Sequence, residues 1–165
     1  MLEFAQKKLR EAQFFFRHLA AESRRVVVPE PEAFDFYLSA FLSSARSVEH
    51  ALHYEKKKEF NLWFQQWAAH NQSEYEFLDQ MFDLRDAEVH RAGAGTNTEW
   101  EVVPMIEALE AGFEFMGSPW AEKPQVKRKL HRVKLGKSQE EVVGTCKRCL
   151  ELLEKIIKEF SASHS

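Results

Sequence analysis

The most unusual chemical group in this sequence is an arginine within an otherwise apolar helix stripe. Positions 75, 78, 82, 85 and 89 are three or four residues apart, so they would share one face of a helix. Four of these positions hold Tyr, Leu, Phe and Val, and the fifth holds Arg85. A guanidinium group that faces a protein core is costly unless an acid or an anion neutralises it. Arg85 therefore predicts a site for an anionic group.

A histidine with useful acid–base chemistry follows five residues later, at His90. Five steps of about 100° place this residue about 140° around the helix from Arg85. A single helix therefore does not hold the two side chains next to each other by geometry alone. Either the long arginine side chain reaches around the helix, or a second copy of the chain brings its own residue to the site.

The residues from Arg85 to His90 read Arg-Asp-Ala-Glu-Val-His, and this string resembles the motif of the HEPN superfamily. Active HEPN proteins are small helical bundles that carry Arg, then Asn, Asp or His, then a few residues, then His. Arg85, Asp86 and His90 match these three positions. A second arginine and histidine with similar spacing, Arg46 and His53, do not fit the motif, because Ser47 rather than Asn, Asp or His follows the arginine.

The resemblance implies RNA cleavage without a metal ion or other cofactor. In such a reaction the RNA 2′-hydroxyl attacks the adjacent phosphate and leaves a cyclic phosphate and a free 5′-hydroxyl. His90 would be the general acid/base, and Arg85 would stabilise charge on the phosphoryl oxygens. Asp86 would orient one of these two side chains or hold a dimer contact. Many relatives lack nuclease activity, so RNA binding without cleavage is the other form of this hypothesis.

The family also implies partners. HEPN sites are usually composite and form where two protomers meet along the motif helices, which predicts a C2 homodimer. A toxin or defence role, with an antitoxin protein as partner, is implied by the family alone.

Structural explanations of the same residues remain open. Arg85 would be structural if it paired with a buried acid, for which Glu49 and Asp79 are candidates. His90 would be explained by its place near a helix C-terminus, where a protonated imidazole is favoured. The protein would then be a non-catalytic helical bundle that serves as an interaction module.

A second set of polar residues lies in the preceding helical segment. Arg46, Glu49 and His53 share a helix face, and we expect them to line the same cavity as the motif arginine. A metal-binding bundle is a further alternative, because His50 and His53 are three residues apart, Glu49 is adjacent, and His18 could complete the set.

Six cations and a histidine are concentrated in residues 127–137, which read as a strand or hairpin. A strand there would present a basic strip that binds phosphates with salt-sensitive affinity. The candidate RNA-binding residues are Lys127, Arg128, Lys129, Arg132 and Lys134. The alternative is a solvated edge strand whose charges discourage aggregation.

The composition sets the limits of these hypotheses. The net charge is −3, so no overall basic field attracts nucleic acid. Cys146 and Cys149 form a Cys-x-x-Cys pair without a second pair or a βα context, which favours two apolar thiols on a helix face in a reducing compartment. The N-terminus does not resemble a signal peptide, and no apolar run approaches 18 residues, so we expect a cytoplasmic protein.

Apolar periodicity predicts the elements that position these residues. Helices are expected at 2–22, about 32–57 with an end or bend at the lysines 56–58, and about 62–70. A fourth helix would begin at a capping box formed by Ser73 and Glu76 and stop at Gly93.

The last helix would begin at Ser138, with Glu141 completing its capping box. Between these helices, residues 98–137 predict a small hairpin, with Thr98 and Glu101 as another capping box and a helical turn at 105–111. The predicted fold is all-α: an up-and-down bundle of four to five helices with a small β-hairpin insertion before the last helix. It forms a single domain, 1–165, with a frayed tail at about 161–165.

Overall fold

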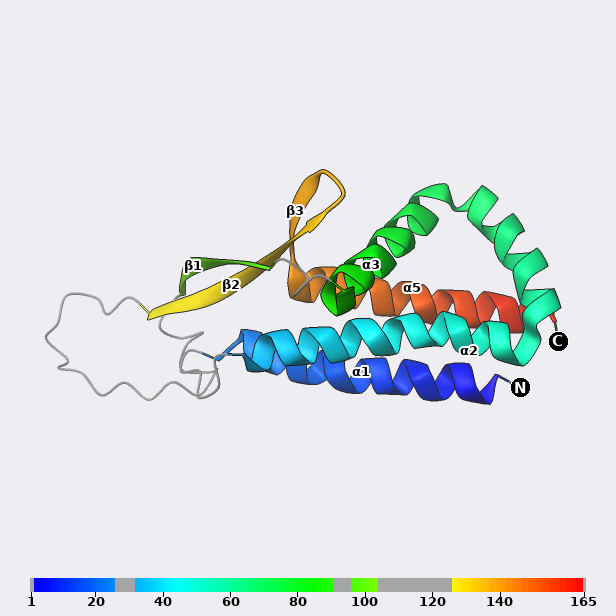
Figure 1. Ribbon diagram of the computed structural model, residues 1–165, viewed down its shortest axis with the longest axis horizontal. Helices are drawn as coiled ribbons and strands as arrows, with labels where there is room; N and C mark the ends of the chain where they lie inside the picture. The colour runs from blue at the N-terminus through cyan, green and yellow to red at the C-terminus, as the bar shows by residue number, and fades with distance from the viewer. Residues whose placement is uncertain (1, 26–31, 91–95, 104–125, 165) are drawn as a thin grey trace, which may run out of the picture.

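A computed structural model describes residues 2–25, 32–90, 96–103 and 126–164 of the protein (Figure 1). For residues 88–90, 100–103 and 126–129 it describes the backbone but not the side chains. The described residues form four helices and three strands. In chain order they are α1 (Glu3–Ser23), α2 (Ala33–His70), α3 (Gln72–His90), β1 (Asn97–Val103), β2 (Val126–Leu135), β3 (Ser138–Glu141) and α5 (Val142–Ser163).

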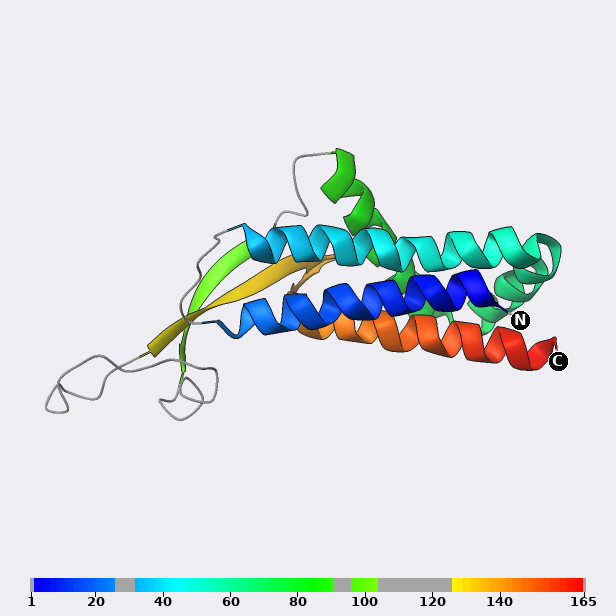
Figure 2. The ribbon, with the colours of Figure 1, turned by 90° about the horizontal axis from the view of Figure 1, so that it is seen from below.

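The predicted all-α bundle with a small sheet before the last helix is confirmed. Helices α1, α2 and α5 lie lengthwise beside one another; α1 runs opposite to α2, and α5 runs in the same direction as α2 (Figures 1 and 2). The predicted apolar stripes form the core because helical periodicity places them on one side of each helix. Among the most deeply buried side chains are Leu19, Leu38, Phe41, Val48, Leu153 and Ile156. No helix in the described part of the chain is long and apolar enough to cross a membrane.

The predicted second and third helices are one bent helix. Lys56 has non-helical backbone angles (φ −145°, ψ 48°), and helical structure continues on both sides of it. A bend at the lysines is therefore confirmed, and a separate third helix is wrong. After the bend, α2 leads away from α1 and α5, and α3 leads back towards them (Figure 1). Phe60, fully buried, packs against Phe160 of α5 with ring centroids 5.3 Å apart and holds this segment to the bundle.

The insertion contains a three-stranded antiparallel sheet in the order β1-β2-β3. Thr98 and Glu101 lie in β1, paired with His131 and Arg128 of β2, so the capping box predicted there is wrong. Strand pairing overrides the local capping signal because it satisfies the backbone groups of the whole segment. The predicted helical turn at 105–111 and the predicted stop at Gly93 lie outside the described residues.

Two other helix starts differ from the prediction. Helix α3 begins at Gln72, so Ser73 is not its cap. Ser138 belongs to β3, and Glu141 is the N-cap of α5: its carboxylate accepts hydrogen bonds from the backbone N–H groups of Val143 (2.9 Å) and Gly144 (2.5 Å). The expected frayed tail also differs, since α5 continues to Ser163.

Candidate functional site

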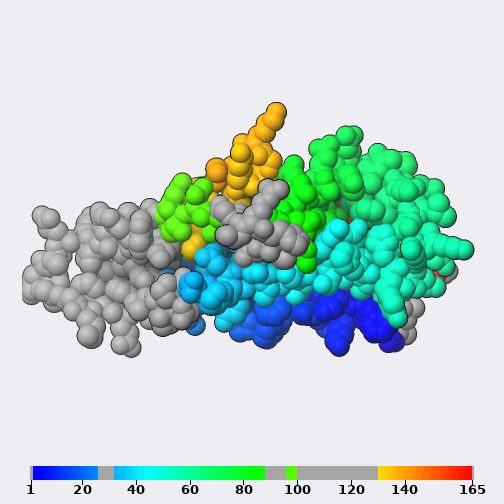
Figure 3. Space-filling view, in the orientation of Figure 1, coloured from blue at the N-terminus to red at the C-terminus, as the bar shows by residue number. Residues whose placement is uncertain are grey.

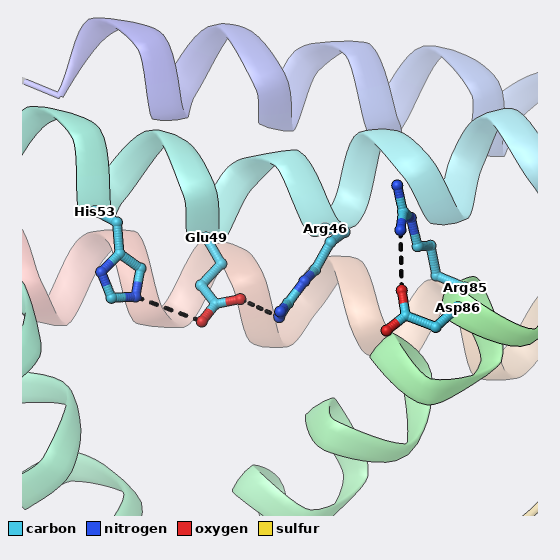
Figure 4. A network of polar contacts seen from close by, with 5 residues as sticks. All are labelled: Arg46, Glu49, His53, Arg85 and Asp86. Carbon is cyan, nitrogen blue, oxygen red and sulfur yellow. Dashed lines mark hydrogen bonds and ion pairs between the residues drawn. The ribbon is translucent and has the colours of Figure 1, made fainter. Parts of the chain in front are cut away.

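Arg85 lies on the side of α3 that packs against α2. It follows Phe82 by three residues, so the two side chains share a helix face. Phe82 is buried, whereas the side chain of Arg85 is 29% exposed. The guanidinium group extends from α3 towards α2 (Figure 4). The sequence prediction of a cation in an apolar stripe therefore corresponds to a half-buried arginine at a helix–helix contact.

The ion pair of Arg85 in the described part of the chain is with its neighbour Asp86. The guanidinium Nη1 donates to Asp86 Oδ1 over 2.9 Å. Neither Glu49 nor Asp79 fills the role of the buried acid proposed from the sequence, because Glu49 is paired with residues of its own helix and Asp79 is exposed. Asp86 is itself 56% exposed, so solvent screens this pair and its net contribution to stability is small.

One donor of Arg85 has no partner among the described residues. The Nε atom is buried and makes no hydrogen bond there. A buried donor without an acceptor costs about 1–3 kcal/mol. Arg85 therefore keeps an unused hydrogen-bond donor at the contact between α2 and α3.

Asp86 and His90 complete the motif on the same helix. Asp86 directly contacts Arg85, which agrees with a role in orienting it. His90 is the last residue of α3, at the C-terminal end where the helix dipole favours a positive charge. The structure describes the backbone of His90 but not its side chain, so only its position on α3 is given.

Arg46, Glu49 and His53 form a continuous row of polar contacts along α2 (Figure 4). Arg46 Nη1 pairs with Glu49 Oε2, and His53 Nε2 lies 3.6 Å from Glu49 Oε1. The Arg46 guanidinium lies over the ring of Phe82, 4.2 Å from its centroid. These contacts show that the three residues share one face of α2 and that Arg46 reaches the motif helix; a cavity shared with Arg85 stays a prediction.

The contact of Phe82 with Arg46 was not predicted from the sequence, where Phe82 is one of the apolar stripe residues. Phe82 lies one helical turn before Arg85 and forms the platform for Arg46. The apolar stripe indicates that Phe82 faces a neighbouring helix. It does not indicate which residue of that helix contacts Phe82, because this depends on how the two helices pack. The contact links the two parts of the site that the sequence could only treat separately.

The histidines do not assemble a metal site in the described part of the chain, where no group of three or more His, Cys, Asp or Glu side chains could hold an ion. His18 lies between aromatic rings of α1 and α2, stacked on Tyr37 with centroids 5.1 Å apart. His50 is exposed, and His53 contacts Glu49 and the edge of Phe60.

The basic run forms β2, as predicted, but β2 is the central strand rather than a solvated edge. Arg132 donates from Nε to Glu99 Oε2 of β1 over 2.9 Å, and the register sets Arg128 opposite Glu101. Lys134 is exposed, whereas the side chains of Lys127, Arg128 and Lys129 are not described. Glu99 on the neighbouring strand therefore offsets the charge of Arg132 in the predicted basic strip.

Cys146 and Cys149 are buried free thiols on the inner face of α5. Burial raises the pKa of Cys149 to about 12 and, together with the charges of Cys149 and Glu141, raises the pKa of Cys146 well above its ordinary value. A thiol in this environment is protonated and not nucleophilic. The predicted role as small apolar side chains agrees with this burial.

Known proteins give no further guidance on the site: no family model, no curated protein and no solved structure matches this chain.

Proposed function

We propose that this protein is a HEPN-like endoribonuclease that cleaves RNA without a metal ion. The observation that carries the proposal is Arg85, a half-buried cation with a buried donor that lacks a partner among the described residues. An RNA phosphate would supply the missing acceptor, and its charge would offset the cost of holding a guanidinium at a helix contact. The match of Arg85, Asp86 and His90 to the HEPN motif supports the same assignment.

The proposed reaction is an internal phosphoryl transfer within RNA. The 2′-oxygen forms a bond to phosphorus while the bond to the 5′-oxygen breaks, which gives a cyclic phosphate and a 5′-hydroxyl. His90 performs acid–base chemistry, since an imidazole exchanges protons near neutral pH. Arg85 stabilises negative charge on the phosphoryl oxygens, and Asp86 holds the guanidinium in place.

The proposal includes a homodimer, with the site completed where two motif helices meet, and an antitoxin protein as a further partner. These parts rest on the family resemblance. The two buried thiols suit a reducing compartment such as the cytoplasm, where the proposal places the protein.

An RNase assay on the purified protein tests this proposal. A fluorophore–quencher RNA is incubated with the protein in EDTA, and the products are identified by mass spectrometry. We expect cyclic-phosphate ends, and we expect His90→Ala to lower the rate by about 10²- to 10⁴-fold. His70→Ala is the matched control, because His70 also ends a long helix but lies outside the site. Arg85→Ala should lower the rate by about 10²-fold or more.

The control variants decide the outcome. Equal cleavage by wild type and His90→Ala would mean a contaminating nuclease or a different site. RNA binding that depends on Arg85, without cleavage, would identify the binding form of the hypothesis. The absence of both binding and cleavage would contradict the proposal.

A non-catalytic interaction module is the second candidate, and an exposed aromatic pair favours it. Phe4 and Tyr54 are 57% and 81% exposed, and their rings contact each other edge to face at 6.0 Å. Large exposed aromatic side chains are typical of binding surfaces. Pull-down with a Phe4→Ser/Tyr54→Ser double variant would test this candidate, which predicts loss of the partner without loss of fold.

A further inference from the structure

A second arginine, on the facing helix, contacts the motif helix one turn before the motif arginine. Arg46 of α2 stacks over Phe82 of α3, and Phe82 is one helical turn before Arg85. Arg46 therefore contacts α3 one helical turn before Arg85, while the Arg85 side chain extends from α3 towards α2 (Figure 4). Each is 29% exposed, so neither is fully solvated.

Each of these half-buried cations has an acidic partner that neutralises its charge only in part. Asp86 pairs with Arg85 but is mostly exposed, so water screens its charge. Glu49 pairs with Arg46 but also lies 3.6 Å from His53 Nε2, so its two oxygens are divided between two residues. Phosphate groups of an RNA backbone would give each guanidinium a fully charged partner.

The arginines at the α2–α3 contact are partly exposed, so a ligand can reach them. In Figure 3 the side chains of α3 lie against those of α2 on the displayed face of the molecule. Arg46, Glu49 and Arg85 are all partly exposed rather than sealed in the core. Arginine suits this position because its planar fork can bind a phosphate while its face stays on an aromatic ring.

We propose that Arg46 is a second phosphate-binding residue of the RNA site, and that Glu49 competes with the RNA backbone for it. This inference rests on the proposed function and extends it from one phosphate contact to two. Without RNA, Glu49 holds Arg46 on α2. With RNA bound, the phosphate replaces Glu49 as the partner of Arg46, and Glu49 keeps its contact with His53.

The salt dependence of RNA binding tests the role of Arg46. Each phosphate contact to a single strand contributes about 0.7 to the slope of log K against log salt concentration. The probe is a labelled 2′-O-methyl RNA, which lacks the attacking hydroxyl and stays intact. We expect Arg46→Ala to lower the slope by about 0.7 and the affinity by about tenfold, whereas Arg46→Lys keeps most of the slope.

The matched control is Arg148→Ala. Arg148 of α5 also lies over an α3 ring, 4.0 Å from the centroid of Phe77, and has no place in the site. It therefore reproduces both the loss of one charge and the loss of one cation–π contact. If Arg46→Ala and Arg148→Ala have the same slope, Arg46 makes no phosphate contact and the inference is overturned.

A change at Glu49 tests the competition and does not depend on the stability of the arginine variants. Glu49→Gln should tighten RNA binding by about fivefold, because the competing carboxylate is removed. Glu151→Gln, which changes the net charge equally at an exposed pair with Lys147, should have less effect. Equal effects of the two variants, or weaker binding in Glu49→Gln, would overturn the competition.

The two proposals fail in different ways. If Arg85→Ala weakens binding and Arg46→Ala resembles the Arg148 control, the proposed function stands and the inference about Arg46 is wrong. If wild type does not bind the probe or cleave RNA, the proposed function is wrong and the inference falls with it.

Discussion

Arg85 is a half-buried cation with incomplete pairing at a helix–helix contact. A structural arginine in a helix contact is usually satisfied by a buried acid, and its loss leaves that acid unpaired. Arg85 instead pairs with an exposed neighbour and keeps a buried Nε without a hydrogen bond to the described residues. Little stability therefore depends on its charge.

This contrast gives a prediction about stability and binding together. Arg85→Met should raise the free energy of unfolding by about 1 kcal/mol, because an apolar side chain of similar length removes an incompletely paired cation from the α2–α3 contact. The same variant should lose RNA binding. Chemical denaturation and the 2′-O-methyl RNA titration measure the two effects. A structural arginine would give the opposite result for stability, a loss of 2 kcal/mol or more by the same estimate.

The thiols of α5 give a second prediction at this scale. Burial raises the pKa of Cys149 to about 12, compared with 9.0 as its ordinary value. The unfolded protein therefore loses the thiol proton near pH 9, while the folded protein keeps it until about pH 12. The contribution of this thiol to stability is fully present below pH 9 and decreases as the pH rises through this interval.

Denaturation between pH 8 and 11 measures this effect. Stability should fall with rising pH, and Cys149→Ala should make the decrease shallower, although the variant is less stable at pH 8. In the folded protein at pH 8, a thiol reagent should label both cysteines slowly, and it should label them quickly in denaturant. Fast labelling of the folded protein would show that the thiols are accessible.

At the scale of elements, period and pairing determine what a sequence can predict. The apolar stripes of α1, α2 and α5 were predicted correctly, because a repeat of 3.6 residues can be recognised within one segment without knowing which surface it packs against. The bend of α2 was predicted from the lysines 56–58, which are solvated. The strand β1 was missed because Thr98 and Glu101 also fit a capping box, and only pairing with β2 decides between the two.

The same distinction applies to the candidate site. The face shared by Arg46, Glu49 and His53 follows from helical spacing within one element, and the structure bears it out. The stacking of Arg46 on Phe82 depends on how α2 packs on α3, which no local pattern encodes. For this reason the sequence could nominate both arginines but could not bring them together.

The start of α5 gives a prediction at the element scale. Glu141 accepts hydrogen bonds from two backbone N–H groups of the first turn, which would otherwise lack partners. Glu141→Ala should lower the free energy of unfolding by about 1 kcal/mol. Glu140→Ala is the control, because this neighbouring glutamate contacts only Ser138 in the described contacts. Equal losses of stability in the two variants would argue against a capping role.

At the scale of the whole molecule, the chain places its termini and its sheet at opposite ends of the bundle. Figures 1 and 2 show both termini at one end and the β1–β2 ribbon at the other, with the C-terminal end of α3 on one side between them. The motif helix therefore lies on the outside of the three long helices. This position leaves it available to a second copy of the chain, which the proposed composite site requires.

Subunit complementation tests whether the site needs two chains. Arg85→Ala and His90→Ala are each expected to be inactive, but in a heterodimer of the two variants one composite site loses both groups and the other keeps both. When the variants are unfolded together and refolded at equal amounts, half of the dimers are mixed, so about one quarter of wild-type activity should return. A site contained within one chain gives no recovery on mixing. Activity that stays absent in a verified heterodimer would therefore place Arg85 and His90 in the same subunit.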